Sequence, residues 1–150
     1  GVATISPWLD LSCGSPTYVS NAFSSQGLTG DVMFRSPAGK CREEFRACAA
    51  TYVGSEDDLK RPLLSPYWIA RDCQQSDDAL VLDKLQRAQV PIWACAGAAE
   101  TLAGEILDFE SRLKGRIPVE VWLHEGAFHV WPLFNSSKRF RSRDVAMENL

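Results

Sequence analysis

The most informative segment of this 150-residue chain is Leu123-His124-Glu125-Gly126-Ala127-Phe128-His129-Val130-Trp131. It contains both histidines of the protein, and it continues a segment from Val119 whose period-two pattern is typical of a strand. Upstream, the apolar run from Ile92 to Ala96 is typical of a parallel strand that is buried on both faces, and Gly97 ends it. Because a helix is predicted between these two strands, the three segments form an expected βαβ unit with a right-handed crossover.

The connecting helix is predicted from Thr101 to Lys114. Its apolar residues recur at helical spacing and form one stripe that should face the sheet: Leu102, Ile106, Phe109 and Leu113. The pattern places Glu105, Glu110 and Arg112 on the side that faces water. Gly115 and Pro118 then end the helix.

The earlier part of the chain gives weaker patterns. Val2 to Ser6 is predicted to be a strand that Pro7 ends, and 6–40 is predicted to be irregular, as lids and binding loops are. Two further helices are predicted, over 41–53 and 77–89. The buried sides of these two helices are expected to carry Phe45, Cys48, Ala49 and Tyr52, and Leu82, Leu85 and Ala88, respectively. Between them, the proline-containing segment 61–68 is predicted to be extended and to be either a cover over the core, which is favoured, or the wall of a pocket.

Composition restricts the class of protein. The length fits one domain, and a net charge of −3 argues against nucleic acid as the main partner. The five cysteines form no Cys-x-x-Cys pair, so the sequence predicts neither a zinc site nor a disulfide framework, and a reducing, cytoplasmic compartment is favoured. No apolar run is long enough for a membrane span, and no signal peptide is recognised.

An acid and an imidazole follow the two strands of the βαβ unit. Glu100 comes just after the first strand and His129 just after the second, and the carboxyl ends of parallel strands are where open α/β sheets bind ligands. A carboxylate beside an imidazole fixes its tautomer and stabilises the imidazolium. Two plainer interpretations stay open at this point: Glu100 as an ordinary acid at a helix N-terminus, and His129 as a structural histidine. His124 is expected to be an exposed residue at a strand end.

Four stretches, in order along the chain, resemble motifs in the C-terminal half of an α/β-hydrolase of the hormone-sensitive-lipase-like (fold-3) carboxylesterase family. They are Ser6-Pro7-Trp8-Leu9-Asp10-Leu11, Leu64-Ser65-Pro66, Gly97-Ala98-Ala99-Glu100-Thr101-Leu102 and Glu125-Gly126-Ala127-Phe128-His129-Val130-Trp131. The resemblance runs from Gly1 to about Phe134. It implies an α/β fold class: three parallel strands with flanking helices, a cap or lid segment over 12–40, and the start of a truncated C-terminal helix over 135–150.

The resemblance also implies roles for individual residues. His129 would be the general base and Glu100 the acid that orients it, with Trp8 lining the acyl pocket. Glu105 and Asp108 would be fallback acids, although their place in the helix suggests that they point outward. The implied substrate is a small carboxylic ester, and no metal or organic cofactor is implied.

One part of the family pattern is missing. The sequence contains neither the Gly-x-Ser-x-Gly turn of the nucleophile nor a His-Gly-Gly-Gly-type oxyanion loop. We therefore expect the serine to precede Gly1, this segment to be inactive alone, and the strand over 2–6 to lack a partner on one side. Two alternatives remain: a non-catalytic, degenerate homologue, and an amide or formamide hydrolase of the same fold.

Overall fold

The structure is a computed structural model that describes residues 1–22, 30–31, 40–70 and 76–133. The strands are β1 (Val2–Ile5), β2 (Ile92–Gly97) and β3 (Val119–His124). The α-helices are α1 (Thr17–Ser20), α2 (Lys40–Val53), α3 (Ser76–Ala88) and α4 (Ala103–Leu113). Three 3₁₀ helices complete the described elements: η1 (Glu56–Lys60), η2 (Pro66–Ala70) and η3 (Trp131–Leu133).

The three strands form one parallel sheet in the order β1-β2-β3. Strand β2 lies in the middle, and α4 connects it to β3, so the predicted βαβ unit is confirmed. Strand β1 lies at one edge of this sheet, so among the described residues it has a partner strand on one side only, as expected. The register pairs Gly97 with His124, so the loops that follow β2 and β3 begin side by side.

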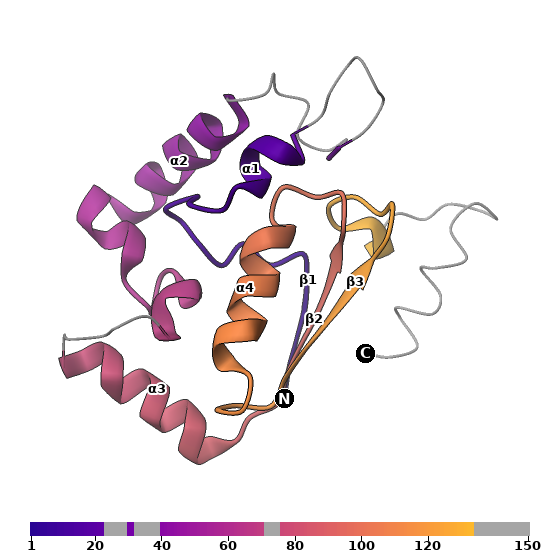
Figure 1. Ribbon diagram of the computed structural model, residues 1–150. Helices are drawn as coiled ribbons and strands as arrows, with labels where there is room; N and C mark the ends of the chain where they lie inside the picture. Colours follow the sequence, from indigo (N-terminus) through magenta and orange to yellow (C-terminus); the bar gives the residue numbers. More distant parts are fainter. Residues whose placement is uncertain (23–29, 32–39, 71–75, 134–150) are drawn as a thin grey trace.

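All four described α-helices lie on one side of the sheet (Figure 1). The predicted stripe of α4 is confirmed: Leu102 and Ile106 pack with Ala94 and Ala96 of β2, and Phe109 and Leu113 pack near the amino ends of the strands. On the opposite face, Trp131 of η3 packs with Cys95. Burying the whole stripe against the sheet stabilises the βαβ unit, because apolar area removed from water contributes about 25 cal/mol per Å².

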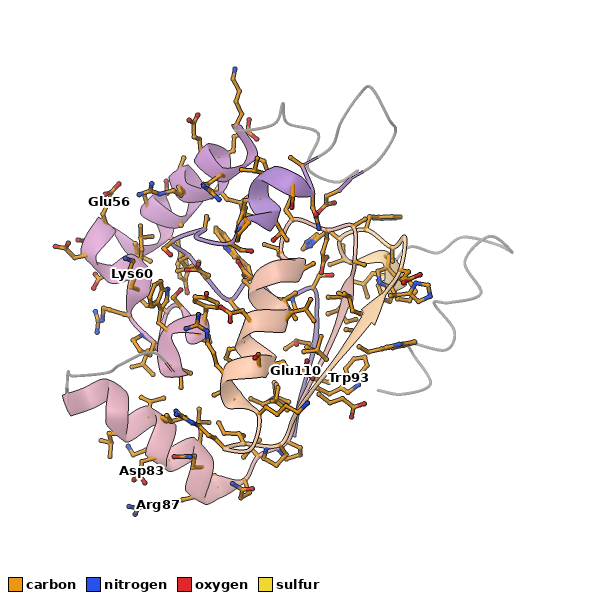
Figure 2. The ribbon with its side chains drawn as sticks, in the orientation of Figure 1. Glu56, Lys60, Asp83, Arg87, Trp93 and Glu110 are labelled. Carbon is orange, nitrogen blue, oxygen red and sulfur yellow. The ribbon has the colours of Figure 1, made fainter. Side chains whose placement is uncertain are left out.

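The polar side of α4 differs from the prediction. Glu105 does not face water: it is buried, and its Oε1 accepts hydrogen bonds from the backbone N–H groups of Leu9 (2.6 Å) and Asp10 (3.0 Å). Glu110 is only partly exposed and points toward the strands (Figure 2), where its Oε1 accepts from Val121 N at 3.0 Å. Both carboxylates satisfy backbone donors that the helix pattern could not reveal, since those donors belong to distant segments.

Arg112 is also drawn away from water. It is ion-paired with Asp108 of the preceding helical turn, donates to the hydroxyl of Tyr67 at 2.9 Å, and lies over the Tyr67 ring. By contrast, the Asp83–Arg87 pair of α3 (Figure 2) lies on an exposed face with 2.9 Å between the charged atoms.

The predicted buried side of α2 is confirmed for Phe45 and Ala49 and wrong for Cys48 and Tyr52. Cys48 is exposed and the Tyr52 side chain is 73% exposed, whereas Cys41 and Ala49 are buried and Phe45 is half-buried. The helix thus uses the row spaced by four residues, because Phe45 packs edge-on against Trp8 and Tyr18. In α3 the prediction holds for Leu82 and Leu85, but Ala88 is exposed.

The remaining segments complete the helical side of the molecule. Tyr67 and Trp68 cover the core as predicted, but 66–70 is a 3₁₀ helix rather than an extended segment, because Pro66 stands at its first position, where no N–H is needed. Within the predicted cap segment 12–40 the structure describes α1 and a bridge between Ala22 and Asp31. The predicted C-terminal helix over 135–150 lies outside the described residues.

Candidate active site

The loops after β2 and β3 bring Glu100 and His129 together. The distance from His129 Nδ1 to Glu100 Oε2 is 3.2 Å, within reach of a hydrogen bond in which Nδ1–H donates. The Glu100 side chain is fully buried and that of His129 is 19% exposed. Glu100 lies two positions before the N-cap residue Leu102 of α4.

The backbones of the two loops are joined directly. Ala98 N donates to His124 O at 2.9 Å, and Ala99 N donates to Ala127 O at 3.0 Å. At Gly97 the two backbone segments approach so closely that a Cβ there would lie 2.3 Å from the carbonyl oxygen of Ala127. Only glycine allows this approach. It sets the separation between the loop after β2, which carries Glu100 (the acid loop), and the loop after β3, which carries His129 (the histidine loop).

The histidine loop is also held from β1. Ser6, the residue after that strand, is buried, and its Oγ accepts a hydrogen bond from Val130 N at 2.9 Å. Its own N–H donates to Cys95 O at 2.7 Å. Both Ser6 and Val130 have left-handed backbone conformations, with φ of 46° and 49°. Sequence reasoning assigned Ser6 no such role; a small hydroxyl residue directly after a predicted strand was the only available signal.

The acid loop is held from the segment before α2. Asn21 Nδ2 donates to the carbonyl oxygens of Ala98 (3.1 Å) and Glu100 (2.9 Å). Asp31 Oδ2 accepts from Thr101 N at 3.0 Å. The sequence pattern did not single out Asn21 or Asp31, because the weak periodicity of this segment gives no direction to its side chains.

The electrostatics of the pair follow from burial. Among the described residues, Glu100 Oε1 has no hydrogen-bond partner, so Oε2 and its contact with His129 provide the only described side-chain hydrogen bond of this carboxylate. Burial and the nearby Glu100 charge raise the pKa of the Cys95 thiol to about 11, which keeps it protonated and unsuited to act as a nucleophile. The arrangement can hold one imidazole tautomer and stabilise a positive charge on the ring.

The other residues singled out from the sequence make different contacts. His124 is the last residue of β3, with Nδ1 2.9 Å from Glu125 O and the ring against Trp131. Trp8 is half-buried against Phe45, and its indole N–H donates to Asp10 O at 3.0 Å. Of the fallback acids, Glu105 is buried beneath the 9–10 backbone and Asp108 is paired with Arg112; neither contact involves His129.

No three histidine, cysteine or acidic side chains in the described part of the chain gather as a metal site would require. Likewise, none of the helices that the structure describes is both long and apolar enough to cross a lipid bilayer. An open groove of about 510 Å³ lies at the amino ends of the strands, beside Gly1, Pro91 and Pro118, at the end of the sheet opposite the two loops.

No protein-family model matches the sequence, and no curated protein matches it. Solved structures do match. A hormone-sensitive lipase from a metagenome library aligns with 99% of this chain and 40% of its own, at a TM-score of 0.64 and 18% identity. The EstE5-PMSF structure aligns with 97% of this chain and 39% of its own, at 0.64 and 16%. An esterase of the bacterial hormone-sensitive lipase family aligns with 87% and 35%, at 0.57 and 21%.

The chain thus spans between about a third and two-fifths of the length of the structures that it matches. At identities of 16 to 21% the likeness concerns the fold. It agrees with the parallel three-stranded sheet, the flanking helices and the βαβ connection described above. The chain has the fold of part of an α/β-hydrolase.

Proposed function

We propose that this chain supplies the acid and the general base of a serine carboxylesterase of the hormone-sensitive-lipase-like family. The observation that carries the proposal is the 3.2 Å contact between His129 Nδ1 and the buried Glu100, formed at the carboxyl ends of adjacent parallel strands. In an α/β sheet this is the edge at which ligands bind. The likeness to structures named as esterases and as a lipase adds the reaction class.

In the proposed reaction the serine hydroxyl belongs to polypeptide outside this chain. With Nδ1 directed at Glu100, His129 would take the serine proton at Nε2 while the serine oxygen forms a bond to the ester carbonyl carbon. The same proton then passes to the leaving alcohol, and an acyl-serine remains. Water hydrolyses that intermediate through the same base. The Glu100 carboxylate stabilises the imidazolium and does not itself take the proton.

Trp8 is the residue that we propose for the wall of the acyl pocket. Its ring is fixed by edge-on packing against Phe45, with centroids 5.0 Å apart, and by the hydrogen bond to Asp10 O. A fixed, half-buried indole can border an acyl chain without moving. Replacing Trp8 with Ala should change the ratio of KM values between short and long acyl esters more than it changes kcat for the shortest ester.

The test uses the longer protein that contains this chain, with p-nitrophenyl butyrate as substrate; crystals of EstE5, a structural match, were soaked with that ester. We expect ester hydrolysis that falls about 10⁶-fold in kcat for His129→Ala and about 10⁴-fold for Glu100→Gln. His124→Ala is the matched control and should stay near wild type. Faster cleavage of amides than of esters would support an amide hydrolase instead, and no activity on either panel would support a non-catalytic homologue.

A further inference from the structure

Side chains from the segment before α2 form hydrogen bonds to the backbone of the acid loop. Asn21 binds two carbonyl oxygens of the loop, those of Ala98 and Glu100. Thr17 Oγ1 donates to Thr101 O at 2.7 Å, and Asp31 Oδ2 accepts from Thr101 N at 3.0 Å. Three side chains that lie between 70 and 84 residues away in the sequence thus hold the backbone on both sides of the Glu100 Cα atom.

The Glu100 carboxylate depends on this backbone for its position. Its only described side-chain hydrogen bond goes to His129, and Oε1 has no partner among the described residues. A side chain that is held by one hydrogen bond points where its Cα directs it. A small rotation of the peptide at Glu100 would therefore change the distance between its Oε2 and the imidazole.

Asn21 is itself rigidly placed. Its N–H donates to Thr17 O at 3.0 Å, its carbonyl accepts from Asp31 N at 2.8 Å, and its Oδ1 accepts from Ser20 Oγ at 3.1 Å. With Oδ1 held by Ser20, the amide presents both Nδ2 hydrogens to the acid loop. A carboxylate at this position would instead place an acceptor against two carbonyl oxygens.

We propose that Asn21 is a positioning residue: it sets the backbone of Glu100 so that the carboxylate holds the Nδ1–H tautomer of His129. Asp31 holds the same loop, because its Oδ2 accepts from Thr101 N. The inference rests on the proposed function, since it concerns the acid and base named there, but its primary readout does not require activity. It makes the segment before α2 part of the apparatus that orients the base.

The test measures, in the 150-residue chain, which ring nitrogen of His129 carries the proton. Only two histidines are present, so ¹⁵N-labelled histidine gives two resolvable ring systems. Spectra recorded at about pH 9, above the ordinary histidine pKa of about 6.5, report which ring nitrogen carries the proton. In the wild type, His129 should carry it on Nδ1. In Asn21→Ala the Nδ1–H fraction of His129 should move at least halfway toward that of an unstructured peptide.

Two controls separate positioning from general loosening. His124 is an internal one, since its Nδ1 faces Glu125 O and should not respond. Ser65→Ala is the matched variant: the buried Ser65 Oγ accepts from Leu11 N (2.9 Å) and donates to Leu9 O (3.2 Å), so it too removes two hydrogen bonds to backbone. An unchanged His129 tautomer in Asn21→Ala, or an equal change in Ser65→Ala, overturns the proposal. If Asn21→Ala does not fold, Asn21→Ser is judged by the same criteria.

The kinetic counterpart distinguishes this inference from the proposed function. In the longer protein, Asn21→Ala should lower kcat for p-nitrophenyl butyrate about 10- to 100-fold with KM nearly unchanged, because misplacement of the base acts on the chemical step. A tautomer that responds in a protein without esterase activity would sink the proposed function and leave the positioning role standing. Esterase activity in the longer protein, together with a His129 tautomer that does not respond to Asn21→Ala, would overturn the positioning role and leave the proposed function standing.

Discussion

The backbone at Gly97 lies against the carbonyl of Ala127 so closely that a Cβ added to Gly97 would stand 2.3 Å from that oxygen. The contact joins the end of β2 to the loop that carries His129, and Ala99 N donates to the same carbonyl. The spacing between acid and base is therefore set by backbone contact. It does not depend on the two catalytic candidates alone.

Replacing Gly97 with Ala should push the two loops apart. We expect the free energy of unfolding, measured with urea, to fall by about 1–3 kcal/mol, because the clash is with backbone that must shift. The histidine ring signals of His129 should change at the same time. Gly115→Ala is the control: its positive φ makes alanine unfavourable, but nothing lies within 4 Å, so the His129 signals should not move. If the His129 ring signals change equally in Gly97→Ala and Gly115→Ala, the contact at Gly97 does not set the loop spacing.

Glu105 should make the stability of the chain depend on pH. Burial raises its pKa from an ordinary 4.5 to about 8, against the opposing effect of hydrogen bonds from Leu9, Asp10 and Tyr18. A carboxyl whose pKa is higher in the folded state binds more protons there than in the unfolded state. The free energy of unfolding should therefore decrease, by up to a few kcal/mol, as pH rises from about 4.5 to about 8.

Glu105→Gln checks this assignment, since glutamine keeps the shape and the acceptor oxygen without titrating. The decrease between pH 4.5 and 8 should be largely removed in this variant. Glu56→Gln is the matched control, because the Glu56 side chain is 78% exposed and its removal should leave the pH dependence as in the wild type. A Glu105→Gln curve parallel to the wild-type curve would show that another group is responsible.

Ser6 should stabilise the histidine loop. In Ser6→Ala the N–H of Val130 loses its acceptor in a part-buried site, which should lower the free energy of unfolding by about 1–3 kcal/mol. Hydrogen exchange at Val130 should become faster. Thr51→Ala removes a comparable hydroxyl on the exposed side of α2 and should change stability by no more than about 0.5 kcal/mol. Unchanged exchange at Val130 would exclude this role for Ser6.

The sequence predicted the βαβ unit well because its signals are local. The apolar run before Gly97 marks a strand that is covered on both faces, the stripe of α4 marks one buried helix face, and the alternation before His124 marks a strand. The meeting of Glu100 and His129 followed from the rule that parallel strands end at the same edge.

The failures share a cause. Glu105 reads as a surface acid of α4, and only the arrival of the 9–10 backbone more than ninety residues away in the sequence makes it a buried acceptor. Asn21 and Asp31 lie in a segment without periodicity, so no sequence pattern could direct them to the acid loop. Cys48 and Tyr52 were assigned wrongly to the buried row of α2 for the same reason, since Trp8 and Tyr18 decide which row packs. Each of these three errors concerns a contact between segments that are far apart in the chain.

The coupling between Glu100 and His129 can be measured by a double-mutant cycle on kcat for p-nitrophenyl butyrate, made in the longer protein with Glu100→Gln, His129→Ala and the double variant. If Glu100 acts only through His129, the double variant should be no slower than His129→Ala alone, because removing the base already removes what the acid contributes. Losses that multiply, with the double variant slower than His129→Ala by the full Glu100→Gln factor, would show that the two residues act independently and would contradict the account.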